Sequence, residues 1–587
     1  MDLLSIFYGH IDTSLIPTST KNSGVSRGGL TNNPAVDRAS VSLIALTKIG
    51  NIVAPPHPQI SLSPIEKQTL KSWPAVYKWC TFFYTTRIEP GDAIKPELRR
   101  AAMDMIGGVI YSLSRFDSVR KVIADTPGAI ELATRIWLVE DACIEPSSMP
   151  IPVNSAALDA LLIFPDYIPP PFGGNPFVDE RENAVRSRLD RVVTAAGGDT
   201  SRVVDLTFSR IRTATAIDER IHEPRTAIIL DLIGHLSRSA SHPLRLAFLS
   251  KGITAFVTKL AVVIVGMLDR SHVHQQGLLD SLVASLGFLS NTIESTDGFT
   301  WVGKAVSAGF LQAWTGAARH IHTFDNHEDA EMVIEIMEKI VPRYMVYKSV
   351  INSVHTAMKK VKDETKFDDW KDHGAKKVWA TFEELALERY TIGQDMKTLK
   401  GAACDNYANC HNIDLKNNFM KCSGCSNTLY CSRECQKVAW KEGGHKLVCK
   451  LKQQELLEGK FQSVSKTDAT FFHHLATSDA RRYLPTLRRL AESTYPLLAD
   501  SPTSLVTTID YMVYPPRLGL YPLAEHEKYS PQRALNVSPN AELRNDELIQ
   551  RARDHPGEYG IIQSKMANGQ GMQSVLSIVP GAFLEER

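Results

Sequence analysis

Residues 404–449 read CDNYANCHNIDLKNNFMKCSGCSNTLYCSRECQKVAWKEGGHKLVC, and this stretch decides how its part of the chain folds. It holds seven of the nine cysteines of the chain together with two histidines. The spacing of the candidate metal ligands is C-x5-C-x11-C-x2-C-x5-C-x3-C-x9-H-x3-C. Thiolate and imidazole groups suit Zn²⁺, and eight of them make two tetrahedral sites. In chain order the candidates are Cys404, Cys410, Cys422, Cys425, Cys431, Cys435, His445 and Cys449.

The spacing of the later ligand pairs is typical of helices. Ser432 is a predicted N-cap, which places Cys435 in the first turn of a helix that continues through Trp440. His445 and Cys449 are four residues apart, so they lie on one face of a following helix. Both pairs can therefore direct two donor atoms toward one ion.

Four such pairs most often fold as a cross-brace, in which alternate pairs share an ion. The first and third pairs would then hold one zinc, through Cys404, Cys410, Cys431 and Cys435. The second and fourth pairs would hold the other, through Cys422, Cys425, His445 and Cys449. A catalytic zinc keeps one position open for water or substrate, and eight protein ligands for two ions leave none. We therefore predict two structural zinc ions and no enzymatic activity.

The ligand order, with histidine seventh and cysteine last, resembles that of the MYND-type zinc finger. The sequence LYCSRECQ at residues 429–436, followed by Trp440, also matches this family. The resemblance covers residues 404–449 of a chain of 587. The first pair departs from it, because MYND fingers usually have C-x2-C there and this chain has C-x5-C. This departure leaves His411 as an alternative ligand to Cys404.

The resemblance also implies a function, because MYND fingers bind short proline-containing peptides. In the family a glutamine and a tryptophan on the helix line the peptide groove, and Gln436 and Trp440 match them. Their separation of four residues places both on one helix face. A tryptophan offers a flat surface for proline rings, and a glutamine amide can bond to a peptide carbonyl. The other interpretation of Trp440 is packing against the zinc sites.

The chain as a whole has the composition of an ordinary globular protein. It is 43% hydrophobic and 22% charged with a net charge of +1, so no global field attracts nucleic acid or membrane. Its length predicts two to four domains. We predict a mostly irregular segment at 1–60, a helical region at 61–395, the finger at 404–449 and a C-terminal module at 465–587.

The helical region shows apolar residues every three or four positions, as at Trp73 and Val76. Three of its stretches resemble one another, each with a helix, a loop and then a glycine before an apolar-faced helix. The glycines are Gly128, Gly252 and Gly309. This pattern resembles a degenerate α-solenoid of the armadillo or HEAT type, in which glycine lets one helix turn back along the last. An irregular helical bundle is the alternative.

The pattern changes after the finger to strand-like runs at 505–514, 560–562 and 573–578. These runs, together with an amphipathic helix before them, predict a small α+β module. The predicted fold class is therefore mainly α, with a solenoid-like helical region, a small cross-brace finger that binds two zincs and the α+β module.

Several enzymatic motifs are absent from the sequence. It contains no GxxxxGK[ST] phosphate loop, no GxSxG nucleophile elbow and no HExxH motif. The sequences that flank MYND fingers in SET methyltransferases are also missing, although a divergent SET-type methyltransferase remains an alternative. A DNA-binding regulator is another. The Lys, Arg, Asp and Glu residues of 404–450 give +3, and seven thiolates with two Zn²⁺ add −3, so a near-neutral finger disfavours DNA binding.

The cysteine pattern also bears on the cellular compartment. Clustered cysteines at metal-binding spacing indicate a reducing compartment. The first residues lack the basic segment of a signal peptide, and the longest apolar run, Leu260 to Leu268, is too short to span a membrane. We expect an intracellular protein, in the nucleus or the cytoplasm, whose partners are proteins with proline-containing peptides. The resemblance leaves an association with transcription open.

Overall fold

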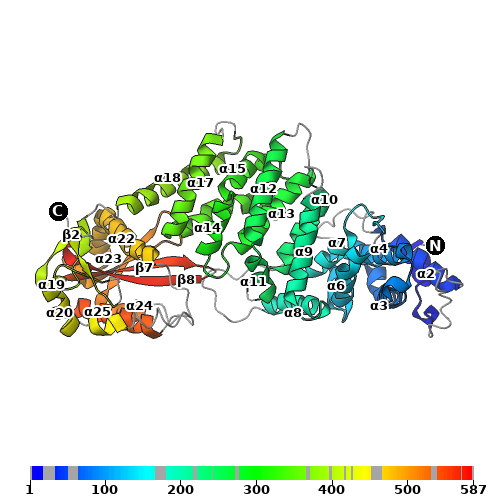
Figure 1. The fold of residues 1–587 in the computed structure, drawn as a ribbon, viewed down its shortest axis with the longest axis horizontal. Helices are drawn as coiled ribbons and strands as arrows, with labels where there is room; N and C mark the ends of the chain where they lie inside the picture. The colour runs from blue at the N-terminus through cyan, green and yellow to red at the C-terminus, as the bar shows by residue number, and fades with distance from the viewer. Residues whose placement is uncertain are drawn as a thin grey trace. The chain divides into compact units, whose positions relative to one another are not determined.

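The computed structural model describes residues 3–17, 33–49, 64–143, 145–164, 180–215, 221, 223–240, 242–270, 276–364, 370–395, 400–415, 418–424, 428–443, 445–450, 466–529, 539–569 and 571–584. The chain divides into two compact units, with unit 1 ending at Thr292 and unit 2 beginning at Ile293. Figure 1 shows that helices predominate and that the longer strands lie near the C-terminus, which confirms the predicted mainly α class.

Unit 1 is helical in the part that the structure describes. Its helices are α1 (Leu3–Gly9), α2 (Pro34–Leu46), α3 (Pro64–Phe83), α4 (Pro96–Leu113), α5 (Asp117–Asp125), α6 (Ala129–Val139), α7 (Val153–Leu162), α8 (Glu180–Ala195), α9 (Thr200–Thr215), α10 (Glu223–Leu236), α11 (Pro243–Ser250), α12 (Ile253–Arg270) and α13 (Gln276–Thr292). Helices α1 and α2 belong to the segment at 1–60, where we expected mostly irregular chain. Val36, Leu43 and Leu46 of α2 are buried, so this segment contributes to the apolar core.

In unit 1, several helices pack against the helix that follows three places later in the chain. Helix α4 packs against α7, α7 against α10, and α10 against α13. Such recurrence is what stacked repeats of three helices produce, since each repeat contacts the next. The likeness to armadillo or HEAT repeats stays a prediction.

The three glycines that relate the helical stretches each precede a helix. Gly128, Gly252 and Gly309 have φ values of 87°, 82° and 109° and lie before α6, α12 and α15 (Phe310–His320). Side chains with a Cβ rarely adopt this left-handed region. Each glycine follows a helix of eight or nine residues, and α11 and α12 are bent by 64° across Gly252. The glycines therefore allow sharp turns between successive helices.

Unit 2 contains further helices, the finger and the C-terminal module. The helices before the finger are α14 (Phe299–Ser307), α15, α16 (His327–Glu335), α17 (Lys348–Glu364) and α18 (His373–Asp395). The finger contains β1 (Lys400–Ala403), α19 (Tyr407–Cys410), β2 (Ile413–Leu415), β3 (Met420–Lys421), β4 (Leu429–Tyr430) and α20 (Arg433–Lys441). Strands β1 and β2 pair antiparallel, as do β3 and β4.

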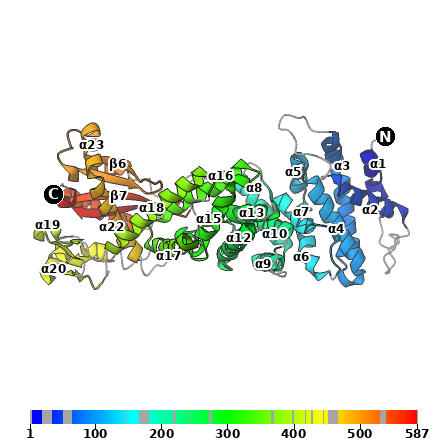
Figure 2. The same cartoon turned by 90° about the horizontal axis from the view of Figure 1, so that it is seen from above.

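The C-terminal module is a four-stranded sheet with helices. Its elements are α22 (Lys466–Arg482), α23 (Leu484–Thr494), β5 (Leu505–Asp510), β6 (Arg517–Pro522), α24 (His526–Tyr529), α25 (Pro539–Asp554), β7 (Tyr559–Asn568) and β8 (Gly571–Pro580). The strand order is β6-β5-β7-β8, with β5 parallel to β7 and the other pairs antiparallel. Figure 2 shows α23 on one side of strands β6 and β7 and the finger helices α19 and α20 on the other. The predicted runs at 505, 560 and 573 correspond to β5, β7 and β8.

The hairpin of β7 and β8 reaches the helices at the start of unit 2 (Figure 1). The Tyr347 hydroxyl donates to the Ala567 carbonyl at 2.5 Å, and the Tyr344 hydroxyl donates to the Gly569 carbonyl at 3.0 Å. Gly569 has a φ of +61°, and a Cβ there would lie 1.9 Å from the carbonyl oxygen of Thr296. The hairpin tip therefore requires glycine at this position.

A buried ion pair connects α18 to the C-terminal module. Nη1 of Arg389 lies 2.9 Å from Oδ2 of Asp479, and the Tyr511 hydroxyl donates to the same oxygen at 2.8 Å. All three residues are almost fully buried. Separating the two charges would leave each of them buried without a partner. The ion pair therefore favours the position of the module against α18.

Across the described ranges, we find no single helix with the length and apolar character needed to cross a bilayer. Helices α11 and α12 meet those criteria only together, as a pair bent by 64°.

Candidate metal centre

Four cysteines of the finger come together in one group, which we call the first cluster: Cys404, Cys410, Cys431 and Cys435. Their sulfur atoms all lie within 4.8 Å of one another. The sulfur of Cys431 is 3.9 Å from that of Cys410 and 3.4 Å from that of Cys435. Sulfurs around a tetrahedral Zn²⁺ with bonds of about 2.3 Å lie about 3.8 Å apart. The donor atoms and their spacing therefore fit zinc.

The start of α20 sets the position of the last ligand in the first cluster. Ser432 is the N-cap, and its hydroxyl oxygen accepts a hydrogen bond from the Cys435 amide at 3.1 Å. Cys435 consequently lies in the first helical turn, as predicted, with its sulfur beside that of Cys431. The Cys431 amide donates to the sulfur of Cys404 at 3.5 Å, a contact that stabilises a thiolate.

Burial disfavours ionisation of two thiols in the first cluster. Desolvation raises the pKa of the Cys404 thiol and also that of Cys410. Ionising several neighbouring thiols in this environment is unfavourable without added positive charge, and a bound Zn²⁺ supplies that charge. The cluster therefore has the properties of a metal site.

His411, which the sequence left as an alternative to Cys404, lies outside the first cluster. It follows α19 with a φ of 49°, and its Nδ1 is 3.4 Å from Oε2 of Glu558. Its side chain is 59% exposed, whereas Cys404 is 2% exposed. The geometry thus brings Cys404, and not His411, to the other three cysteines.

A second group, the second cluster, contains Cys422, His445 and Cys449. Its three candidate ligand atoms lie within 4.8 Å of one another, and all three residues are buried. The two sulfurs are 3.8 Å apart, as expected for tetrahedral zinc. Cys425, the predicted fourth ligand, lies outside the described residues. The seven described candidate ligands are grouped in the alternation that a cross-brace predicts.

The finger elements place the second cluster by short-range contacts. Cys422 follows β3, and its amide donates to the Thr428 carbonyl at 2.9 Å, which closes the hairpin with β4. His445 and Cys449 lie one turn apart in the helical stretch 445–450, as their spacing predicted. A hairpin and a helix therefore meet at this cluster.

The residues between the first two cysteines form a helical turn, α19, that sequence analysis did not predict. Tyr407 in this turn is 7% exposed and belongs to the same apolar core as Val506 and Tyr559 of the C-terminal module. The Ala408 amide donates to the Tyr559 hydroxyl at 2.9 Å. The long C-x5-C spacing accommodates this contact and was the only signal for it in the sequence. The finger and the C-terminal module share one core here.

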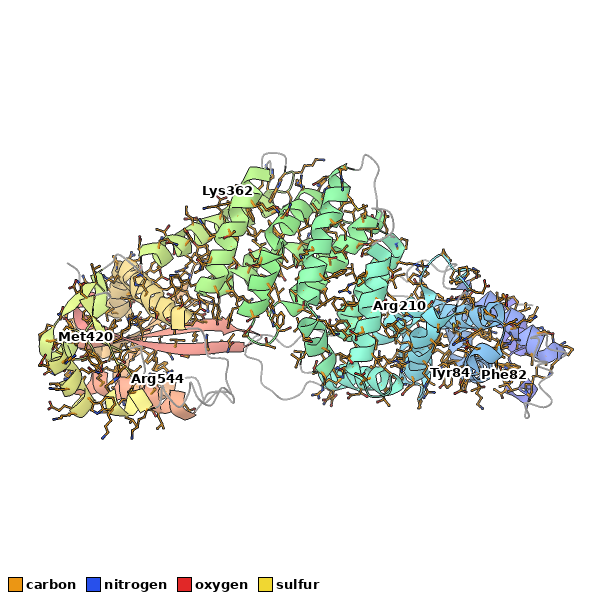
Figure 3. All side chains as sticks on the ribbon, viewed as in Figure 1. Phe82, Tyr84, Arg210, Lys362, Met420 and Arg544 are labelled. Carbon is orange, nitrogen blue, oxygen red and sulfur yellow. The ribbon has the colours of Figure 1, made fainter. Side chains whose placement is uncertain are left out.

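Gln436 and Trp440, the predicted peptide-binding residues, both lie on α20. Gln436 is partly exposed and Trp440 is 37% exposed. The indole ring centroid is 5.8 Å from the imidazole centroid of His445. Trp440 therefore packs against a residue of the second cluster with part of its ring and faces solvent with the rest. Met420 of β3, labelled in Figure 3, is exposed to the same extent.

Comparison with known proteins agrees with the finger's geometry. Residues 404–449 match the MYND finger family, and fingers of this family bind zinc. The match covers the finger and no other part of the chain. No curated protein shows a significant match to the chain. The chain thus contains a zinc-binding finger of the MYND type, and this finger indicates a role in protein–protein interaction.

Proposed function

We propose that residues 404–449 bind two structural zinc ions and that the chain is an intracellular interaction scaffold whose finger binds proline-containing peptides. Two separate clusters of donor atoms support the count of two ions. In this proposal the first cluster provides four thiolates. Cys425 joins the second cluster as its fourth ligand, because it follows Cys422 at the C-x2-C spacing.

The zinc count can be measured on the full-length protein by native mass spectrometry. The wild type is expected to hold two zinc ions. Cys404→Ser and Cys425→Ser should each weaken one of them, because three remaining ligands bind zinc less tightly. His411→Ala is the matched control, since the alternative ligand lies outside the first cluster. Loss of zinc in His411→Ala, with none in Cys404→Ser, would contradict the assignment.

Full coordination by protein groups supports a structural role for both ions, because no ligand position remains for substrate. An enzymatic alternative, a SET-type methyltransferase, requires S-adenosylmethionine. We expect no heat of binding when this compound is titrated into the zinc-loaded full-length protein in a calorimeter. A saturable binding isotherm would contradict a purely structural role for the chain.

The observation that carries the peptide-binding proposal is the partly exposed Trp440 one helical turn from Gln436. An exposed indole is a suitable surface for proline rings, and the glutamine amide lies on the same helix face. Because zinc holds α20 in place through Cys435, the two side chains are presented on a rigid element.

This proposal can be tested with a library of proline-rich peptides and the full-length protein. Trp440→Ala should reduce affinity most, and Gln436→Ala should reduce it less, as expected when an aromatic anchor dominates binding. Trp440 contacts His445, so zinc content must be measured in each variant. Leu447→Ala, an exposed apolar residue of the finger, is the control. Unchanged peptide binding in a zinc-loaded Trp440→Ala protein would exclude this groove.

A further inference from the structure

Asp405 directly follows the first ligand of the first cluster, and it connects the finger to α25 of the C-terminal module. Nη1 of Arg551 donates to Oδ1 of Asp405 at 2.9 Å. The other terminal nitrogen of Arg551 donates to the backbone carbonyl of Asp405. The two residues are 146 positions apart in the sequence. A single arginine therefore fixes both the side chain and the backbone of Asp405.

The second carboxylate oxygen of Asp405 faces the second cluster. Tyr430 donates its hydroxyl to Oδ2 at 3.3 Å, and Nδ1 of His445 lies 3.7 Å from the same oxygen. The side chains of Asp405 and His445 are 18% and 2% exposed. Asp405 thus has one oxygen toward the C-terminal module and the other toward a zinc-ligand candidate.

Arg551 is itself held firmly. It donates to the Tyr559 hydroxyl at 2.8 Å, and its guanidinium carbon lies 4.6 Å from the centroid of the Tyr559 ring. Its side chain is only 14% exposed. Tyr559 belongs to the apolar core that contains Tyr407. The position of Arg551, and through it that of Asp405, therefore depends on the packed core of the C-terminal module.

Histidine ligands use one ring nitrogen for the metal and the other to donate a hydrogen bond, and a carboxylate at the second nitrogen fixes both the tautomer and the ring orientation. We propose that Asp405 is a positioning residue for the second zinc site. The negative charge of its carboxylate, 3.7 Å from Nδ1 of His445, favours the tautomer that carries the proton on Nδ1, so that Nε2 is directed at the metal with Cys422 and Cys449. Arg551 holds Asp405 in that position, so the C-terminal module contributes to zinc binding in the finger.

The same arrangement links the two clusters. Cys404 provides a sulfur to the first cluster, and the next residue in the chain orients a ligand of the second. Displacement of this short segment would therefore disturb both sites.

The first test is a spectroscopic measurement on the zinc-loaded wild type, for which no variant has to fold. Long-range proton–nitrogen NMR spectra of ¹⁵N-histidine-labelled protein report which ring nitrogen binds the metal. We expect His445 to carry its proton on Nδ1 and to bind zinc through Nε2. Coordination through Nδ1 would overturn the proposal, because Asp405 faces that nitrogen.

The second test compares zinc affinities by competition with a chelator, using full-length variants. Asp405→Asn should lower the affinity of the second site by about 10-fold to 100-fold, the usual effect of removing a partner of a metal ligand. Arg551→Lys keeps the charge but loses the two-pronged contact, so a smaller loss at the same site is expected. In Asp405→Asn the Nδ1–H resonance of His445 should also shift.

Two matched variants serve as controls for the affinity measurement. Asp414→Asn changes a finger carboxylate that accepts a hydrogen bond from the side-chain amide of Asn418. Arg553→Ala changes an arginine of α25 that forms an ion pair with Glu527. Both should leave zinc affinity unchanged. A folded Asp405→Asn protein with wild-type affinity at both sites and an unshifted His445 resonance would refute the positioning role.

Discussion

The finger and the C-terminal sheet belong to the same unit, but different interactions stabilise them. The buried cluster at the centre of the finger includes three residues besides its cysteines, namely Phe419, Tyr430 and Ala439, among those described. The sheet instead buries nearly the whole of β7. A segment with so few apolar residues cannot fold on its own core, so metal ligands and the neighbouring core at Tyr407 compensate. The comparison shows how metal coordination and apolar packing meet within one fold.

Zinc removal should give the largest difference in hydrogen-exchange protection between the finger and the C-terminal sheet. A structural zinc supplies about 10–16 kcal/mol of folding free energy, so chelation is expected to unfold residues 404–449. Strands β5 to β8 should stay folded, because their core contains no metal ligand, although β7 should open faster once Tyr407 leaves the shared core. Hydrogen exchange of the full-length protein with and without EDTA measures both effects. Finger amides that remain protected without zinc would show that packing alone maintains the finger.

Tyr407→Ala should weaken both regions, because the ring lies in the core that they share. Truncating a buried aromatic side chain costs about 3–5 kcal/mol. Hydrogen exchange should show faster opening in α19 and in β7, and Tyr407→Phe, which keeps the ring, should change little. If protection falls in α19 alone, the two regions do not share a core.

Ser432→Ala should give the smallest effect, and only in the finger. Loss of an N-cap costs about 1 kcal/mol, and Ser432 caps α20 beside two ligands of the first cluster. Zinc competition should show a modest loss of affinity at that cluster, with no change in the thermal stability of the sheet. Ser423→Ala, at an exposed turn of the finger, is the control. A fall in sheet stability would mean that the cap affects more than α20.

Local spacing explains why the clustering of the finger's candidate ligands could be predicted. Cys435 and Cys431 are brought together by one helical turn, and the same applies to His445 and Cys449. Each relation extends over four residues, so it is present in the sequence itself. The glycine before each of three helices could be recognised for the same reason.

Contacts between distant residues could not be predicted in this way. The contacts of Tyr407 and Asp405 involve partners about 150 positions away, at Tyr559 and Arg551. Strand β6 was also missed, because Gly519 interrupts its apolar pattern and the strand is defined by pairing with β5. The boundary between the two units at residue 292 has no signal in the sequence, since helical periodicity continues on both sides of it.

The contact of Gly569 with Tyr344 joins residues that are 225 positions apart. In unit 1, by contrast, the bond between Asp159 and His235 spans 76 positions. During translation, unit 1 can therefore begin to fold early. The helices around Tyr344 cannot complete their contacts until the β7–β8 hairpin leaves the ribosome, which happens much later. Until then Tyr344 lacks the hairpin carbonyl that accepts its hydrogen bond in the folded protein.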